Sequence, residues 1–347
     1  MNGAAVVIAG TAGCLLSAAG TPLLGRLALR WGFVDRPGGY KTHGRPVPYL
    51  GGVAIMFATV APFAVLAGLD DVRVTSIVLA AAAVALLGLI DDFSPLSPLV
   101  RLAVETVAAV GVVVGGVQAP LTGSWLDGPV TVLWIVVVTN SFNLLDNMDG
   151  ALGTIAAIGA AFLSGAAFVH AHPALGLLLA ALAHACLGFL LHNRPPAKVF
   201  MGDTGSLFIG FVISCSAALL VTGHGSGTAV AGLLLPTFLA TVDTGTVFLA
   251  RMLAPGRSPM TAGSDHVSHR LRHLGLGTGT VAAVLGAVTA LAGSLCLALA
   301  LGWVAPLVAA VVGVGTALVL IVLLRGVDVY ASSEHPHTPP RTHERLR

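Results

Sequence analysis

Val130–Gly150 reads Val-Thr-Val-Leu-Trp-Ile-Val-Val-Val-Thr-Asn-Ser-Phe-Asn-Leu-Leu-Asp-Asn-Met-Asp-Gly, an apolar run that ends in amides and carboxylates. The run ends a hydrophobic segment long enough to cross a bilayer, so its polar end predicts a helix that meets water. Four polar residues follow one another at intervals of three: Asn140, Asn143, Asp146 and Asp149. Each is a neighbour of the next on a helix surface, although the whole row drifts half-way round the helix. A charge near the bilayer centre costs about 2.5–3.5 kcal/mol, so charged and polar residues in membrane segments usually have a function. We therefore expect the chain to present functional loops such as this one on one side of a membrane.

The overall composition is that of a membrane protein. Of 347 residues, 56% are hydrophobic and only 9% are charged, and the mean hydropathy is +0.93. A soluble domain carries about 25% charged residues, so this chain is not suited to water. The net charge of +2 is too small to indicate a nucleic-acid partner. Four cysteines lie inside apolar runs without CxxC spacing and are expected to be packing residues: Cys14, Cys186, Cys215 and Cys296.

Eleven apolar segments are long enough to cross a bilayer, which predicts an all-α, polytopic membrane protein. They span 3–24, 50–69, 74–90, 99–117, 128–145, 151–170, 173–192, 204–222, 227–250, 278–300 and 303–324. The ninth contains Pro236, which predicts a kink, and Asp243, a buried acid that needs a partner. We expect residues 1–330 to form a single multi-span domain and the tail, 331–347, to be disordered.

The Lys and Arg residues predict the orientation in the membrane. With the N-terminus outside, the loops 25–49, 91–98, 146–150, 193–203 and 251–277 and the tail 325–347 face the cytoplasm. Together with flanking residues, that side carries 16 of the 17 Lys and Arg residues, and only Arg73 is left outside. This excess follows the positive-inside rule and supports an odd number of spans, because an even number would place the basic tail outside.

The carboxylates gather on the same side as the bases. Six lie on the predicted cytoplasmic loops or span ends: Asp91, Asp92, Asp146, Asp149, Asp203 and Asp265. The predicted outer loops hold only Asp70, Asp71 and Asp127. Acids beside bases suggest a site that binds a metal and an anion together. The alternative is that these acids cap helices and pair with nearby arginines.

Two cytoplasmic loops near the N-terminal half carry chemistry. Turn-forming residues surround Lys41 and Arg45, which could be presented to phosphate or could only anchor the membrane surface. Asp91 and Asp92 are adjacent at a membrane exit, where mutual repulsion can raise one pKa into the range of a general base.

Arg101 opens the next span, and Glu105 lies one turn further along the same helix face. An Arg101–Glu105 ion pair is the simpler interpretation of these two residues. A functional role for Glu105 is the alternative.

Two later loops are equally suggestive. Asp203 begins a helix between two glycines and beside hydroxyls, which suits Mg²⁺, although Asp203 or Thr204 could instead cap the helix. His266 and His269 lie three residues apart and could bind a metal or donate to phosphate and sugar oxygens.

With these residues in view, the chain resembles the polyprenyl-phosphate N-acetylhexosamine-1-phosphate transferases, a family of membrane enzymes. The matching stretches come in the family's order over residues 35–275: Lys41–Gly52, the Asp91-Asp92 pair with a base nine residues on, Asn140–Gly153, Pro195–Ser206, Asp243 with Arg251, and Asp265–Leu271. The opening Lys-Thr-His-Gly-Arg-Pro and the eleventh span are more similar to the GlcNAc-1-phosphate branch than to the muramoyl-pentapeptide branch.

The resemblance implies transfer of a sugar 1-phosphate from a UDP-amino sugar to a polyprenyl phosphate, with release of UMP. It implies Mg²⁺, which Mn²⁺ can replace, on Asp203 with Asn143 as a companion ligand. The implied catalytic residues are Asp91 and Asp92, of which either could deprotonate or position the lipid phosphate. The implied substrate-binding residues are Lys41, Arg45, Arg101, Asp146, Asn147, Asp149, His266, His269 and Arg270. A plasma-membrane location with a cytoplasmic active site follows, and a homodimer is compatible with it.

This chain departs from the family pattern at three positions. Arg101 stands where Lys is usual, which keeps the charge and changes the geometry. Ser268 replaces a histidine, and Asn147 stands where glycine is common. We expect these last two to bear on the choice of sugar more than on the reaction.

Two functions of other classes remain as alternatives. A secondary transporter would use Asp243, Glu105 and His184 as an ion path and predicts charges near the midplane and internal symmetry, yet the sequence shows no repeat. An intramembrane aspartyl protease would pair Asp203 with Asp243, but it leaves the other motifs unexplained.

Overall fold

The computed structural model describes residues 3–35, 46–68, 70–253, 263, 265–327 and 329. These residues form thirteen helices and one pair of short strands. The elements are α1 (Gly3–Trp31), β1 (Val34–Asp35), β2 (Val47–Pro48), α2 (Gly51–Ala67), α3 (Val72–Phe93), α4 (Pro98–Val114), α5 (Asp127–Leu145), α6 (Ala151–Val169), α7 (Pro173–Asn193), α8 (Gly202–Val221), α9 (Ser226–Leu234), α10 (Phe238–Leu253), α11 (Val267–His273), α12 (Thr278–Ala300) and α13 (Pro306–Arg325).

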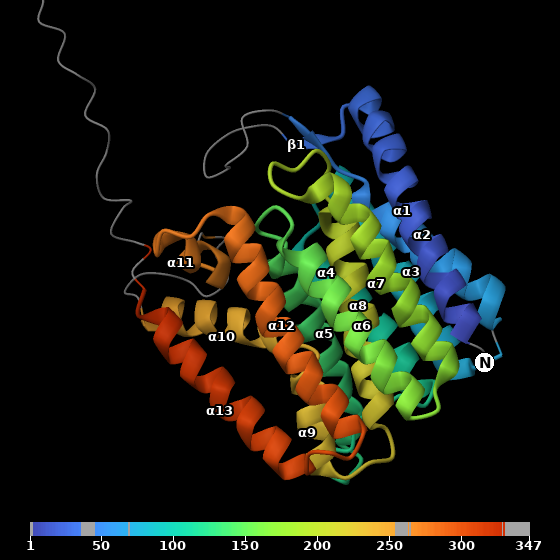
Figure 1. The fold of residues 1–347 in the computed structure, drawn as a ribbon, viewed down its shortest axis with the longest axis vertical. Helices are drawn as coiled ribbons and strands as arrows, with labels where there is room; N and C mark the ends of the chain where they lie inside the picture. The colour runs from blue at the N-terminus through green and yellow to red at the C-terminus, as the bar shows by residue number, and fades with distance from the viewer. Residues whose placement is uncertain are drawn as a thin grey trace, which may run out of the picture.

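Most of the helices run along one axis as a bundle, and α10 lies crosswise to it (Figure 1). Among the described residues, eight helices are long and apolar enough to cross a membrane, which confirms an all-α membrane protein in outline. Ten of the eleven predicted segments coincide with one helix each, but α2 is a shorter apolar helix of 17 residues, and α4 also has 17. The count of eleven therefore stays a prediction.

The ninth predicted segment is not one straight helix. It divides into α9 and α10, which are bent by 79° where the chain passes Pro236. The predicted kink is confirmed, because proline lacks the N–H that would continue the hydrogen-bond ladder. The bend carries α10, which contains Asp243 and Arg251, out to the side of the bundle, where it packs against α13 (Figure 1).

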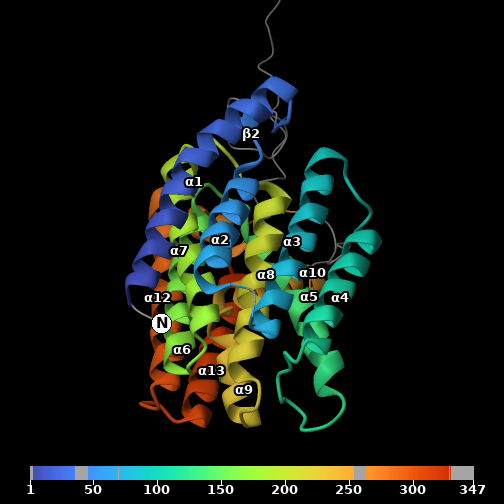
Figure 2. The same ribbon diagram turned by 90° about the vertical axis from the view of Figure 1, so that its right-hand side faces the viewer.

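Helix α8 forms the centre of the bundle, with α2, α3 and α5 packed around it (Figure 2). Its most apolar stretch is entirely buried, whereas α13 buries only 17% of its own. Small residues allow this close packing. A Cβ added at Gly88 of α3 would lie 2.5 Å from the main-chain oxygen of Asp203 in α8. The cysteines are free, and Cys186, Cys215 and Cys296 are buried, as expected for packing residues.

The short strands are a small departure from the predicted all-α fold. β1 and β2 pair antiparallel with Val34 opposite Pro48, and Phe200 donates its N–H to the oxygen of Pro48. The hairpin therefore rests on the loop that precedes α8. Lys41, Arg45 and the predicted disordered tail, 331–347, lie outside the described residues.

Candidate active site

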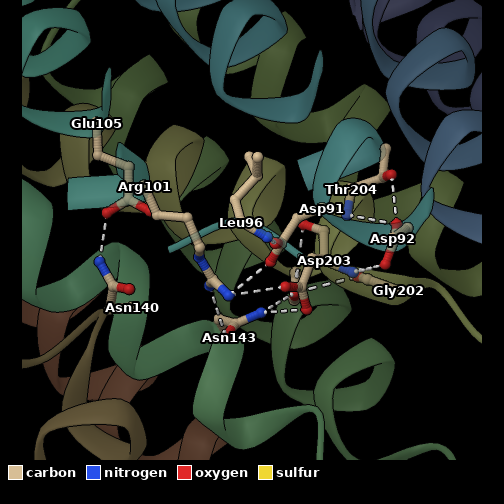
Figure 3. Close-up of polar contacts among 11 residues, drawn as sticks. Asp91, Asp92, Leu96, Arg101, Glu105, Asn140, Asn143, Gly202, Asp203 and Thr204 are labelled. Carbon is tan, nitrogen blue, oxygen red and sulfur yellow. Dashed lines mark hydrogen bonds and ion pairs between the residues drawn. The ribbon is translucent and has the colours of Figure 1, made fainter. Parts of the chain in front are cut away.

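Arg101 stands at the meeting point of α3, α4, α5 and α8. Its Nη1 donates to Asp91 Oδ2 at 2.8 Å and to Asp203 Oδ2 at 3.0 Å, and its Nη2 donates to Asn143 Oδ1 at 3.2 Å (Figure 3). Arg101 thus binds a carboxylate, that of Asp203, which lies 102 positions away in the sequence. We call Asp91, Arg101, Asn143 and Asp203 the Arg101 cluster.

The turn between α3 and α4 explains why Asp91 and Arg101 meet. Asp91 lies in the last turn of α3, and its Oδ1 accepts the N–H of Leu96 in the turn that follows. Ser97 caps α4 by accepting the N–H of Val100, and Pro98 takes the first helical position, where its missing N–H costs nothing. Arg101 in the first turn of α4 is thereby directed back towards α3.

Asp92, the second member of the acid pair, caps α8 from outside that helix. Its oxygens accept the N–H of Asp203 at 2.8 Å and the N–H and hydroxyl of Thr204 at 3.1 and 2.7 Å. The alternative that Asp203 or Thr204 caps α8 is therefore wrong, because the cap comes from Asp92 of α3. Gly202 permits the approach: its φ is +67°, and a Cβ there would lie 2.6 Å from Asp92.

Asn143 is held with its carbonyl oxygen towards Arg101. Its Nδ2 donates to Asp203 Oδ1 at 2.9 Å and to Ser206 Oγ at 2.8 Å. The predicted partnership of Asn143 and Asp203 is thus present as a direct contact. Ser206 was missed by the sequence analysis, although its spacing of three from Asp203 could have revealed a shared helix face.

A second polar layer lies one turn away. Asn140 on α5 donates to Glu105 on α4 and to the oxygen of Val136. Glu105 is fully buried, and its Oε1 has no partner among the described residues. The simple Arg101–Glu105 ion pair is therefore wrong, because Arg101 is engaged with the carboxylates of α3 and α8 (Figure 3).

The loop after α5 lines the same end of the bundle. Asp149 accepts the N–H of Ala197 at 2.9 Å, and so it ties this loop to the one before α8. No described residue makes a hydrogen bond to the Asp146 carboxylate. Burial, followed by the charges of Asp203, Asp92 and Asp149, raises the pKa of Asp146 to about 8.

Asn147 and Ser268, the two departures from the family pattern, contact each other. The Ser268 hydroxyl donates to Asn147 Oδ1, and Asn147 Nδ2 donates to the oxygen of Leu144. Because Ser268 belongs to α11, this contact joins α11 to the loop after α5. Asn147 and Ser268 belong to different sequence motifs, but in the structure they are hydrogen-bonded to each other.

The histidine-containing helix α11 is anchored by buried pairs. His266 Nδ1 lies 2.8 Å from Asp243 Oδ2, and Asp243 Oδ1 accepts the N–H of Val267. Arg251 makes a bidentate pair with Asp265, at 2.8 and 2.6 Å. His269 is half-buried, and its burial, followed by the charges of His266 and Arg272, lowers its pKa.

The Arg270 side chain is buried in the interior of the protein. Its side chain donates to the oxygens of Asp265, Leu324, Arg325 and Val327, the last three at the C-terminal end of α13. A guanidinium that is 1% exposed and bound to main-chain carbonyls through Nε and Nη1 anchors α11 to the end of α13. The expected substrate-binding role of Arg270 stays a prediction, and the contacts that the structure gives this side chain are to the main chain. We call Asp243, Arg251, Asp265, His266 and Arg270 the α11 cluster.

The oxygens of the Arg101 cluster suit a hard cation. Asp91, Asn143 and Asp203 each direct one oxygen to the same guanidinium, which marks a position of positive charge. The described residues contain no group of three His, Cys, Asp or Glu side chains able to hold a metal ion. This donor set is typical of Mg²⁺, which takes one or two carboxylates and completes its shell with water and phosphate.

The sequence of the chain is similar to known proteins. Residues 74–221, which contain the whole Arg101 cluster, match the family model for glycosyl transferase family 4. A Streptomyces coelicolor protein, named only as a glycosyltransferase, is 37% identical over 82% of this chain and 67% of its own length. A probable undecaprenyl-phosphate N-acetylglucosaminyl 1-phosphate transferase of Bacillus subtilis is 32% identical over 74% of each chain.

A phospho-N-acetylmuramoyl-pentapeptide-transferase of a Picosynechococcus species is 35% identical, but over 57% of this chain and 60% of its own. The likeness to the N-acetylglucosaminyl enzyme thus extends over more of both chains. The chain belongs to glycosyl transferase family 4, and within it to the polyprenyl-phosphate N-acetylhexosamine-1-phosphate transferases that its motifs predicted.

Proposed function

We propose that this protein transfers GlcNAc-1-phosphate from UDP-GlcNAc to a polyprenyl phosphate such as undecaprenyl phosphate, releasing UMP. One observation carries the proposal: oxygens from α3, α5 and α8 converge on one cation position at the end of an apolar bundle. Such a place can meet a lipid phosphate from the bilayer and a nucleotide from water. Phosphoryl transfer depends mainly on positioning and charge neutralisation, which this donor set offers.

The membrane arrangement is part of the proposal. Eleven spans, with α9 and α10 together as the ninth, place the N-terminus outside and the Arg101 cluster on the cytoplasmic side of the plasma membrane. The distribution of 16 of 17 Lys and Arg residues on that side supports this arrangement. The reaction would then be the first membrane step of cell-envelope glycan synthesis.

Mg²⁺, or Mn²⁺ in its place, would be held by Asp203 and Asn143. When bound, the metal supplies positive charge that stabilises the diphosphate leaving group. Asp203 Oδ2 and Asn143 Oδ1 both face the position of the Arg101 guanidinium, so no rearrangement of α5 against α8 is needed to offer them to a cation.

The two adjacent acids have different roles in this proposal. Asp91 shares the Arg101 guanidinium with Asp203, and we assign it to accept the proton of the lipid phosphate. Asp92 has both oxygens occupied by donors of α8, so it has none directed at a substrate. Asp92 is therefore a positioning residue that fixes the first turn of α8 and with it Asp203.

The nucleotide and sugar would lie between the loop after α5 and α11. Asp146, Asn147 and His269 border this space, and Lys41 and Arg45 are proposed to reach the phosphates from the first loop. Asp149 and His266 act on the substrate only indirectly, because Asp149 is bound to Ala197 and His266 to Asp243.

The test is release of UMP from UDP-GlcNAc by the purified full-length protein with undecaprenyl phosphate. We expect activity with Mg²⁺ or Mn²⁺, and none after removal of divalent cations with EDTA. UDP-GalNAc and UDP-MurNAc-pentapeptide complete the panel. Asp71→Asn is the matched control, because asparagine keeps the cap of α3 at the far end of that helix. Absence of UMP release with every sugar would refute the proposal.

A second candidate, the muramoyl-pentapeptide reaction, is favoured by the similarity to the Picosynechococcus enzyme. UMP release only from the pentapeptide nucleotide would select it. The transporter has less support, since Asp243 is paired with His266 and His184 Nδ1 lies 2.9 Å from the oxygen of Ala180. The same Asp243–His266 pair removes the second acid that a protease needs.

A further inference from the structure

Arg101 occupies the place that a divalent cation would take, and a buried acid without a full set of partners lies one helical turn behind it. We propose that Arg101 is the resident cation of the metal-free site and that Glu105 receives its guanidinium when a divalent metal binds. The inference rests on the proposed metal site at Asp203 and Asn143. It makes Glu105 a positioning residue that acts through Arg101.

The first observation is that the guanidinium uses the oxygens a metal would need. Nη1 lies 3.0 Å from Asp203 Oδ2 and 2.8 Å from Asp91 Oδ2, and Nη2 lies 3.2 Å from Asn143 Oδ1. A metal on Asp203 and Asn143 would stand beside a fixed positive charge. Like charges in a partly buried site repel strongly, so Arg101 must withdraw for the metal to bind well.

The second observation is the state of Glu105. It is 0% exposed, Oε2 accepts from Asn140, and Oε1 has no hydrogen-bond partner among the described residues. A buried acid normally has its oxygens satisfied, and an unsatisfied one is costly enough to call for an explanation. The explanation we offer is that Glu105 Oε1 accepts a hydrogen bond from the Arg101 guanidinium when the metal is bound.

The third observation is the geometry of the two layers. Arg101 and Glu105 are four residues apart on α4, and Asn143 and Asn140 are three apart on α5, so each pair shares a helix face. Asn143 serves Asp203 in one layer, and Asn140 serves Glu105 in the other (Figure 3). Rotation about the side-chain bonds of Arg101 can therefore move its guanidinium from Asp203 to Glu105 without moving a helix.

The charges of the two layers fit this exchange. Without metal, Arg101 lies between the carboxylates of Asp91 and Asp203. With metal on Asp203, the carboxylate of Glu105 is the nearest acid on the helix of Arg101 itself. Movement of Arg101 towards Glu105 then keeps each carboxylate beside a positive charge.

The experiment measures Mn²⁺ binding to the full-length protein in detergent, without substrates, by electron paramagnetic resonance of free Mn²⁺. Arg101→Gln removes the competing cation and should tighten Mn²⁺ binding about tenfold, because hydrogen bonds between charged groups are worth about that much. Glu105→Gln keeps an acceptor for Asn140 but removes the charge that attracts Arg101, and it should weaken Mn²⁺ binding about tenfold.

The double variant distinguishes this exchange from a purely structural role of Glu105. If Glu105 acts through Arg101, Arg101→Gln/Glu105→Gln should bind Mn²⁺ as tightly as Arg101→Gln alone. Independent, additive effects of the two changes would overturn the proposal. Thr106→Ala, next to Glu105 on the exposed face of α4, should leave Mn²⁺ binding unchanged.

Asp203→Asn separates this inference from the metal assignment. If Asp203→Asn fails to abolish Mn²⁺ binding, the metal site itself is wrong, and the inference falls with it. If Asp203→Asn abolishes binding but Arg101→Gln leaves the Mn²⁺ affinity unchanged, the metal site stands and Arg101 is not the resident cation.

Discussion

The Arg101 cluster and the α11 cluster use similar residues in opposite ways. In the α11 cluster, Arg251 and Asp265 form a bidentate pair with side chains 8% and 1% exposed. In the Arg101 cluster, one guanidinium is shared by Asp91 and Asp203, and the side chain of Asp203 is 31% exposed. In the α11 cluster, the charges of Arg251 and Asp265 neutralise each other in a buried pair. In the Arg101 cluster, two carboxylates share one positive charge, so negative charge is in excess beside the partly exposed Asp203.

This difference indicates which cluster reacts and which one supports. A buried, fully hydrogen-bonded pair is strongly destabilising to break, and it offers nothing to a substrate. Carboxylates that compete for one cation can bind another cation or accept a proton. We therefore expect changes in the Arg101 cluster to alter activity and changes in the α11 cluster to alter stability.

The largest expected effect is that of Asp203→Asn. Activity should fall by at least about 10³-fold, the equivalent of about 4 kcal/mol, because the variant loses the proposed metal ligand. UMP release measures the loss, and thermal unfolding shows whether the protein is still folded. Near-normal activity of Asp203→Asn would contradict the comparison of the two clusters, because Asp203 would then have only a structural role, like Asp265.

Asp265→Ala should mainly affect stability, by about 3–5 kcal/mol, because it removes the bidentate partner of buried Arg251. The measurement is the midpoint of unfolding in detergent. The matched variant Arg251→Met/Asp265→Leu removes both charges, and it should recover most of the lost stability. If Asp265→Ala were as stable as the wild type but inactive, α11 would belong to the reactive part of the site.

Asp92→Asn should have an intermediate effect, since Asp92 acts on Asp203 only through the first turn of α8. An amide can accept fewer of the three hydrogen bonds that the carboxylate receives. We expect about 1 kcal/mol of lost stability, as for other helix caps, and a loss of activity of about tenfold. A loss as large as that of Asp203→Asn would show instead that Asp92 takes part in the reaction.

The smallest effect concerns the pH dependence of stability. The pKa of Asp146 is raised to about 8 in the folded protein, so the folded state holds a proton that the unfolded state releases near pH 4. Stability contributed by this proton is therefore lost as the pH rises from about 4 towards 8. Asp146→Asn should remove this loss and raise the Tm at pH 8 by about 2–4 °C.

The control for this prediction is the comparison of the two proteins at several pH values. The gap in Tm between Asp146→Asn and the wild type should widen from pH 5 to pH 8 and then level off. A constant gap would mean that Asp146 is not titrating in this range.

The sequence analysis placed the polar residues of the candidate site at one end of the apolar segments, but it could not assign their partners. It put Asn143 beside Asp203 through the family resemblance, and the structure shows their contact at 2.9 Å. It expected Arg101 to pair with Glu105 four residues away, because local spacing is visible in a sequence. It could not foresee Asp203, which is 102 residues from Arg101, because only the packing of α4 against α5 and of α3 against α8 brings them together.

The α11 cluster shows the same limit. Arg270 reads as a base in a cytoplasmic loop, and nothing in its neighbours reveals the main-chain oxygens of α13 that surround it. Asn147 and Ser268 each appear as an isolated departure from a motif, whereas the structure joins them through one hydrogen bond. The bend at Pro236 was predictable from the sequence, but its angle of 79° was not.

The sequence by itself determined the class of the protein, the positions of its apolar segments and the family to which it belongs. Those properties depend on local composition, because the hydrophobic effect and the cost of charge in lipid act on each segment of the chain. A single sequence is therefore enough to predict them. Only the tertiary structure decided which carboxylate caps a helix, which one faces a cation and which arginine is structural. Hydrogen bonds require partners within about 3 Å, and only the packed helices set distances of that size.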